Sequence, residues 1–269
     1  MSLQIYIRGG GDLASGVVAR LFRAGWRVMI AEIAQPLSVR RTVAFSEAVY
    51  AGRTTVEGIT AAKAFSIGEA LRIIDDGLVA VLVDPKAAIV EELRPDVLID
   101  ARMLKQPPDM AIDKAPLMIG LGPGFDAGKN CHAIIETKRG HTLGRVIWRG
   151  SAEIDSGVPE SVGVYQSERV LRAPIDGIMN ECLAIGSLVE KGTVVGTVAG
   201  EPVIASFVGV VRGIVHEGVY VTKGLKIGDI DPRCDPALCG LISDKALAVG
   251  GGVVEAILST VSLREKLYG

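Results

Sequence analysis

The segment QIYIRGGGDLASGVVARLFRAGWRVMIAEI, residues 4–33, decides the fold of this chain. Apolar residues fill Ile5 to Ile7 and Val28 to Ile33, two runs of strand length, and they recur at helical spacing from Gly16 to Ala24. This order predicts a strand, a helix and a second strand. Such a unit is typical of an α/β domain built on a mostly parallel sheet.

A glycine-rich turn separates the first strand from the helix. Residues 9–14, GGGDLA, match the pattern G-x-G-x-x-A, and Glu32 ends the second strand about 20 residues further on, which resembles the Rossmann dinucleotide-binding unit. Glycines let backbone N–H groups approach a pyrophosphate at the positive end of a helix, while a carboxylate accepts from ribose hydroxyls. The predicted ligands are Gly9, Gly10, Gly11, Asp12, Leu13, Ala14, Ser15 and Glu32. The alternative is a turn whose glycines serve only the tight connection and helix packing.

Three more apolar runs predict strands that extend this sheet, at Ala80 to Val83, Val97 to Ile99 and Leu117 to Gly120. Helices are expected over Ile67 to Ile74 and Ala87 to Leu93. Because ligands of such sheets sit at the carboxyl ends of the strands, the loops at residues 84–86, 100–102 and 122–124 should line the same rim as the glycine turn.

Further anion ligands are predicted at this rim. Gly122, Gly124 and Lys129 resemble a phosphate loop only superficially, because Lys129 is followed by Asn130 rather than Ser or Thr, yet an anion nest remains open. Arg40 and Arg41 follow the second strand and could bind a phosphate, with solvated arginines as the alternative.

The cysteines indicate neither disulfides nor a metal site. A chain of 269 residues with 49% hydrophobic content can form a stable core without disulfide bonds or a structural metal ion. Cys131 is expected to pack in the core, since adjacent strand residues face opposite ways and it cannot pair with His132 within a strand. Cys234 and Cys239 are spaced too widely for a zinc ribbon, so no metal is expected.

Composition narrows the setting of the protein. We expect a cytoplasmic protein, because nothing at the beginning of the sequence resembles a signal peptide and the apolar runs are too short to span a membrane. A net charge of −2 argues against nucleic acid as a partner.

The second half contains a duplication. Residues 171–198, LRAPIDGIMNECLAIGSLVEKGTVVGTV, align without gaps with residues 203–230, VIASFVGVVRGIVHEGVYVTKGLKIGDI. The matched glycine turns resemble the biotinyl/lipoyl barrel-sandwich hybrid fold, but the turn at residues 198–202 has no lysine to carry a cofactor. We expect this module to pack, form a homo-oligomer or dock a partner. The expected parts are a Rossmann-like nucleotide- or cofactor-binding domain at 1–160, the β module at 168–232 and a C-terminal helical segment at 233–269.

Three stretches of the sequence, at residues 7–52, 122–150 and 243–258, resemble the YqeB-type family associated with selenium-dependent molybdenum hydroxylases. The first half is also similar, more distantly, to the Rossmann domain of XdhC-type proteins. The resemblance implies an accessory protein that binds a molybdopterin-type cofactor or an NAD(P)-like nucleotide, with a molybdenum hydroxylase apo-enzyme as partner.

Two other functions remain open. One is an NAD(P)-dependent oxidoreductase, although no Tyr-x-x-x-Lys or similar catalytic pattern occurs in the sequence. The other is a non-enzymatic docking scaffold. No residue is assigned as catalytic, so the sequence leaves open whether the protein is an enzyme.

Overall fold

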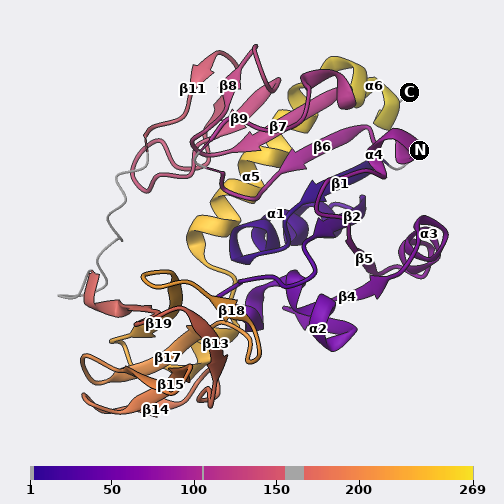
Figure 1. Cartoon of the computed structure of the whole chain (residues 1–269). Coiled ribbons are helices and arrows are strands. Elements are labelled where there is room, and N and C mark those ends of the chain that lie inside the picture. Colours follow the sequence, from indigo (N-terminus) through magenta and orange to yellow (C-terminus); the bar gives the residue numbers. More distant parts are fainter. Residues whose placement is uncertain (1–2, 105, 155–166, 269) are drawn as a thin grey trace. The chain divides into compact units, whose positions relative to one another are not determined.

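The computed structural model describes residues 3–104, 106–154 and 167–268. The chain forms two compact units (Figure 1). Unit 1 comprises Met1–Pro36, Phe45–Asp155 and Ile242–Gly269, and unit 2 comprises Leu37–Ala44 and Ser156–Leu241. Both units are therefore discontinuous in sequence.

Unit 1 is built on a nine-stranded sheet with the order β10-β9-β7-β6-β1-β2-β5-β4-β3. In chain order the strands are β1 (Gln4–Arg8), β2 (Arg27–Glu32), β3 (Arg53–Val56), β4 (Ile59–Ala64), β5 (Val79–Val83), β6 (Val97–Asp100), β7 (Leu117–Leu121), β9 (Ala133–Ile135) and β10 (Val146–Ile147). The short β8 (Asp126–Ala127) pairs separately with β11 (Gly150–Ser151). β1 lies at the centre and is almost fully buried, as its apolar sequence predicts.

The sheet is mixed rather than a Rossmann-like sheet of parallel strands alone, although most of its strand pairs are parallel, as predicted. Its central strands pair in parallel, but β3 with β4 and β9 with β10 pair antiparallel at the two edges. The β3–β4 hairpin was not predicted from the sequence. Its two-residue turn is Glu57-Gly58, and both residues have positive φ, as a tight hairpin turn requires.

Helices cover the sheet of unit 1. They are α1 (Asp12–Arg23), α2 (Ala48–Ala51), α3 (Ile67–Asp75), α4 (Val90–Leu93), α5 (Asp244–Ser259) and α6 (Val261–Tyr268). α1 begins at Asp12 rather than at the predicted Gly16, so the glycine turn leads directly into the helix. The predicted separate segment at 233–269 is instead divided, because α5 and α6 belong to unit 1.

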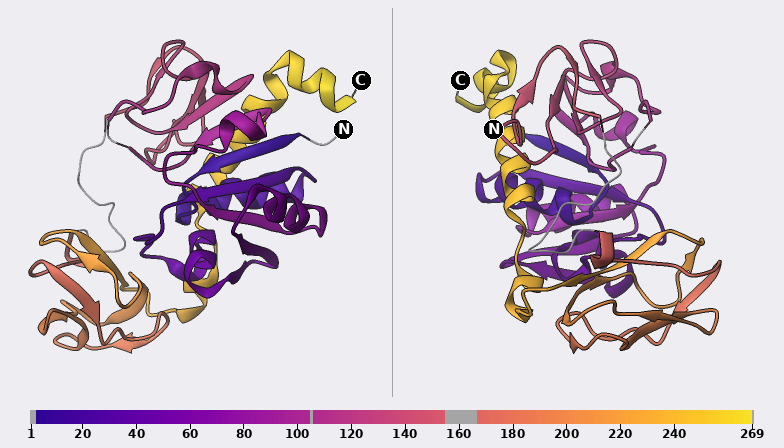
Figure 2. Two further views of the ribbon diagram at one scale, coloured as in Figure 1. Left: turned by 45° about the vertical axis from the view of Figure 1, so that its right-hand side comes forward. Right: turned by 90° about the vertical axis from the view of Figure 1, so that its left-hand side faces the viewer.

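α5 packs directly against α1 (Figure 2), and glycines permit the contact. A Cβ built on Gly16 would lie 2.1 Å from the Ala246 carbonyl oxygen, and one on Gly250 would lie 2.5 Å from the Gly16 carbonyl oxygen. Among the described residues, one helical stretch, Pro236–Ser259, is long and apolar enough to cross a membrane by length and composition. Its α5 part packs against α1 within unit 1.

Unit 2 consists of two four-stranded sheets, β12-β19-β17-β14 and β16-β15-β13-β18, in which all pairs are antiparallel. The strands are β12 (Val170–Arg172), β13 (Gly177–Asn180), β14 (Leu188–Val189), β15 (Val194–Val198), β16 (Glu201–Ile204), β17 (Gly209–Ile214), β18 (Tyr220–Val221) and β19 (Lys226–Asp231). β13, β14 and β15 begin 32 residues before β17, β18 and β19 respectively, which confirms the duplication.

A segment far away in the sequence completes unit 2. Residues 37–44 contribute Val39, whose backbone approaches so closely that a Cβ on Gly213 would lie 2.6 Å from its carbonyl oxygen. Arg41 Nε donates to the Ile214 carbonyl at 2.8 Å, and Thr42 Oγ1 donates to the Cys239 carbonyl at 2.6 Å. Side-chain donors thus hold this segment to backbone acceptors of unit 2.

Candidate functional site

The carboxyl ends of β1 and β6 mark the point where the order of the strands across the sheet reverses. From β1 the chain proceeds to β2 on one side, whereas β6, which follows β5, lies on the other side of β1. In open α/β sheets, ligands bind at such a switch point, outside the carboxyl ends of the strands. Arg8 and Asp100 face each other there in register.

The glycine turn occupies this point, and its geometry requires glycine. Gly9 has φ +91° and donates its N–H to the Ala31 carbonyl at 2.8 Å. A Cβ on Gly10 would lie 2.9 Å from the Ser46 backbone nitrogen, whose N–H bonds to the Gly10 carbonyl. Gly11 is the N-cap of α1 and makes no side-chain cap, so the positive end of a twelve-residue helix lies at the turn.

Glu32 lies beside the turn, as the spacing predicts, but its present contacts are with backbone. Oε2 accepts from the Gly10 N–H at 2.7 Å and Oε1 accepts from the Ile33 N–H at 2.8 Å. A carboxylate has about four acceptor positions, so these two bonds leave capacity for hydroxyl groups.

The remaining predicted residues of the turn divide into two groups. Ser15 and Ala14 are buried, and Ser15 Oγ donates to the Gly11 carbonyl and accepts from the Phe45 N–H. Asp12 and Leu13 are half-buried in the first turn of α1. Ser15 thus fixes the turn to the segment that follows Ala44, which is a structural role.

Four charged side chains form a network beside the turn that the sequence did not predict. They are Arg8, Asp100, Arg102 and Asp109. Arg8 is buried and lies 3.6 Å from Asp100 and 2.7 Å from Asp109. Arg102 binds Asp100 through Nε and Nη2, and it also binds Asp109 at 2.7 Å. Hydrogen bonds from Arg8 and Arg102 hold the pKa of Asp109 far below its usual value. The signal was Arg8 itself, a charge that ends an otherwise apolar strand.

The neighbouring Asp84 loop, also predicted to line the rim, has its carboxylate occupied. Asp84 accepts from the Tyr6 hydroxyl at 2.9 Å and from the N–H groups of Ala88 and Ile89. Burial, together with the charge of Asp84, raises the pKa of Tyr6 well above its usual value. The Asp84 side chain thus caps the turn that leads to α4.

The loop containing Gly122, Gly124 and Lys129 is shaped by its own contacts. Gly122 has φ +70° and Gly124 has φ +105°, and a Cβ on Gly124 would lie 2.5 Å from the Leu104 carbonyl oxygen. Lys129 is exposed and pairs with Asp126 at 2.5 Å. These glycines serve packing, so the anion nest remains a prediction.

Arg40 and Arg41, predicted as phosphate ligands, belong to unit 2. Arg40 is buried, and its Nη2 donates to the carbonyls of Leu238 and Leu241 at 3.3 and 2.7 Å. With Arg41 on the Ile214 carbonyl, both guanidinium groups hold residues 37–44 in unit 2. We leave them out of the site.

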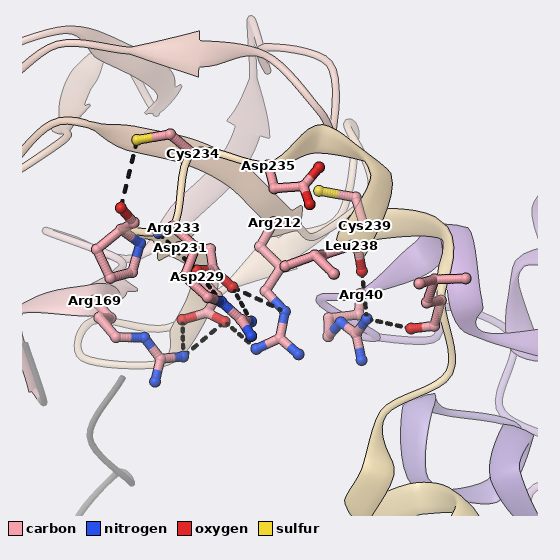
Figure 3. A network of polar contacts seen from close by, with 12 residues as sticks. Arg40, Arg169, Arg212, Asp229, Asp231, Arg233, Cys234, Asp235, Leu238 and Cys239 are labelled. Carbon is pink, nitrogen blue, oxygen red and sulfur yellow. Dashed lines mark hydrogen bonds and ion pairs between the residues drawn. The ribbon is translucent and has the colours of Figure 1, made fainter. Parts of the chain in front are cut away.

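A second polar network lies in unit 2 (Figure 3). Asp229 and Asp231 are buried on β19, where Arg169 binds Asp229 at 2.8 Å and Arg233 binds Asp231 at 2.6 Å. Arg212 lies 3.5 Å from Asp229 and 3.7 Å from Asp231. Buried carboxylates need such partners, and the network joins β17, β19 and the residue before β12.

The cysteines are free, and the prediction for Cys131 is confirmed. Its side chain is fully buried, and burial raises the pKa of the thiol to about 12. Cys239 is also buried, whereas Cys234 is exposed. Within residues 3–104, 106–154 and 167–268, no three His, Cys, Asp or Glu side chains could hold a metal ion together.

Comparison with known proteins identifies a relative without an assigned function. The chain is 46% identical over 254 residues to the uncharacterized protein YqeB of Escherichia coli (strain K12), and the match covers 94% of this chain and 47% of that protein. The chain thus spans about half the length of its relative. No protein-family model matches the chain.

Solved structures that match this chain include aspartoacylase-type proteins. An aspartoacylase family protein from Mesorhizobium loti has a TM-score of 0.28 at 16% identity, with 86% of this chain and 85% of that chain covered. A succinylglutamate desuccinylase/aspartoacylase from Rhodobacter sphaeroides has a TM-score of 0.28 at 14% identity, with 85% of each chain covered. At this TM-score the likeness supports no assignment of activity.

These findings correct the family assignment. The chain is similar to YqeB, but that relative is uncharacterized and no protein-family model matches, so we do not retain the assignment to a molybdenum hydroxylase accessory family with an XdhC-like Rossmann domain. The prediction of a biotinyl/lipoyl barrel-sandwich hybrid at 168–232 is likewise not retained, and we describe unit 2 only as two four-stranded antiparallel sheets. The molybdenum-cofactor role, which rested on the resemblance, is withdrawn, since the relative is uncharacterized.

Proposed function

We propose that unit 1 binds a nucleotide of the NAD(P) or ATP class at the carboxyl ends of β1 and β6. The observation that carries the proposal is the glycine turn at this switch point, where the α1 N-terminus has no side-chain cap. Backbone N–H groups at a helix N-terminus and the helix dipole together favour a phosphate.

The other groups of the site fit a nucleotide. Glu32 is half-buried beside the turn, and its remaining acceptor positions suit ribose hydroxyls. The proposal concerns binding and includes no turnover, because no described side chain at the turn has the arrangement of a nucleophile with its base.

The test uses the full chain and three nucleotides, namely NADH, NADPH and ATP, titrated by isothermal calorimetry. We expect at least one to bind with a dissociation constant below about 1 mM, the upper end of ordinary substrate affinities. Absence of binding by all three at that concentration would contradict the proposal.

A pair of variants at Gly11 separates binding from stability. Gly11 has φ −72°, which any residue adopts, and Asp and Asn are both good N-cap residues. We expect Gly11→Asp to cap α1 and to weaken nucleotide binding about tenfold, since its carboxylate repels the phosphate at the helix terminus. Gly11→Asn has the same shape without the charge and should weaken binding less. Equal affinities for the two variants would mean that no phosphate binds at α1.

A further inference from the structure

Two guanidinium groups lie directly beside the glycine turn. Arg8 ends β1 immediately before Gly9, and Arg102 follows β6, with the Ala101 N–H bonded to the Arg8 carbonyl at 2.9 Å. Arg102 packs against the turn, because a Cβ built on Gly9 would lie 3.3 Å from its Cγ. The two arginines are thus part of the edge where we propose that the nucleotide binds.

One carboxylate oxygen bridges these arginines. Asp109 Oδ1 lies 2.7 Å from Arg8 Nη1 and 2.7 Å from Arg102 Nη2. The opposite side of the network is Asp100, which is fully buried on β6 and also accepts the Arg102 backbone N–H. Two positive and two negative charges balance in this arrangement.

The two carboxylates are not equivalent. Asp100 is fixed in the central sheet, whereas the Asp109 side chain is 60% exposed and lies outside any helix or strand. The contacts that the described part of the chain gives to the Asp109 carboxylate are those with Arg8 and Arg102. The neighbouring Met110 packs against the core, so a change at Asp109 would be a movement of its side chain.

Without the Asp109 carboxylate, Arg8 and Arg102 would favour the binding of another anion. Arg8 is only 2% exposed and Arg102 is 22% exposed, so Asp100 would be the one carboxylate left to both among the described residues, with the Pro85 carbonyl at 3.4 Å as a further acceptor for Arg8. A buried charge without a full complement of partners is costly, and paired guanidinium groups bind phosphate oxygens in a bidentate way. The positive N-terminus of α1, which has no side-chain cap, favours the same ligand group.

We propose that Arg8 and Arg102 form a phosphate subsite next to the glycine turn, and that the Asp109 carboxylate occupies this subsite until a phosphate of the ligand replaces it. This inference rests on the proposed function, since the phosphate belongs to the nucleotide. Asp109 then acts as an internal competitor that sets the affinity, and Arg102 is a ligand-binding residue.

The experiment titrates the full chain with sodium pyrophosphate at constant ionic strength, using isothermal calorimetry. Asp109→Asn removes the competing charge and keeps the shape of the side chain. The apparent dissociation constant is the intrinsic one divided by the fraction of open sites, so we expect binding about tenfold tighter than in the wild type. Asp113→Asn is the matched control, because Asp113 is an exposed aspartate nearby in the sequence, and it should bind as the wild type does.

Two further variants make the result specific. Arg102→Gln in the Asp109→Asn background should abolish the gain, whereas Asp109→Glu keeps the charge and should bind close to the wild type. The thermal shift that pyrophosphate induces gives a second readout should Asp109→Asn be less stable, and it should be larger in this variant. The inference is overturned if Asp109→Asn gains no affinity, if Asp113→Asn gains as much, or if pyrophosphate binds neither variant.

The outcome can be told apart from failure of the nucleotide proposal. ATP binding that is sensitive to Gly11→Asp but unchanged by Asp109→Asn would refute only the subsite. Pyrophosphate binding that depends on Asp109 and Arg102, with no binding of NADH, NADPH or ATP, would support the subsite and refute the nucleotide.

Discussion

The glycines of α5 allow a sharp test of how this helix packs. Gly250 faces α1, and a Cβ there would lie 2.5 Å from the Gly16 carbonyl oxygen and 2.9 Å from Arg20 Cγ. Gly251, the next residue on the same helix, is exposed, and a Cβ there would meet no described atom within 4 Å beyond the helix's own neighbouring backbone. The two positions share secondary structure and differ in their surroundings.

The expected effects have opposite signs. Gly251→Ala should stabilise the protein by about 1 kcal/mol, because alanine is the better helix former. Gly250→Ala gains the same propensity but must separate two backbones, and overpacking of this kind costs about 1–3 kcal/mol or more. We therefore expect Gly250→Ala to be less stable than Gly251→Ala by about 1–3 kcal/mol.

Urea unfolding followed by far-UV circular dichroism measures this difference. For a chain of this size, 1 kcal/mol also corresponds to a Tm change of about 2–4 °C. Gly252→Ala is a second packing variant, since its Cβ would lie 2.2 Å from the Gly144 carbonyl oxygen, and it should behave like Gly250→Ala. If Gly250→Ala and Gly251→Ala were equally stable, the close packing of α5 against α1 would be refuted.

Three other predictions follow from the described contacts. Iodoacetamide at neutral pH should label the exposed Cys234 and spare Cys131, because burial raises the pKa of the Cys131 thiol to about 12. Mass spectrometry identifies the labelled cysteines, and a labelled Cys131 in the folded protein would contradict its burial. Burial opposes ionisation of Glu57, but hydrogen bonds from the Ile242 N–H and Arg23 prevail and lower its pKa. The carboxylate therefore stabilises the protein above its unfolded pKa near 4.5, and this contribution is lost as pH falls through the folded value. Glu57→Gln should cost about 1 kcal/mol of stability at pH 7 and less in acid, and a loss of stability that does not depend on pH would contradict this prediction. Arg41→Ala should destabilise unit 2 by about 1–2 kcal/mol through loss of the hydrogen bond to the Ile214 carbonyl. Arg53→Ala, a change at an exposed arginine on β3, should stay within about 0.5 kcal/mol of the wild type in the same urea assay.

Local patterns in the sequence were sufficient for much of the architecture. The apolar runs predicted β1 and β2, the glycine pattern predicted the turn before α1, and the offset of 32 residues predicted the duplicated strands of unit 2. Glu32 also lies beside the turn, as its spacing indicated. Each of these features depends on neighbours in sequence or on an internal repeat, which is why they could be read from one chain.

Contacts between distant residues could not be predicted in this way. Arg8 and Asp109 are 101 residues apart, and Arg40 reaches Leu241 across 201 residues, so no local pattern links them. The same limit applies to Arg40 and Arg41, whose carbonyl partners lie far away in the sequence and could not be predicted. The edge strands β3 and β10 were missed because they are short and half-exposed, so they lack a continuous apolar run.

The order in which the ribosome makes the chain bears on how the two units can form. Residues 37–44 emerge early, yet the strands that receive them follow residue 167, and α1 emerges long before its partner α5 at residues 244–259. Domains generally fold as units during synthesis, N-terminal first. Here unit 2 is complete only once Leu241 has been made, and unit 1 only once α5 and α6 have followed. The nascent protein must therefore carry an uncovered face of α1 until α5 emerges, and a chain that stops before α5 is expected to depend on chaperones.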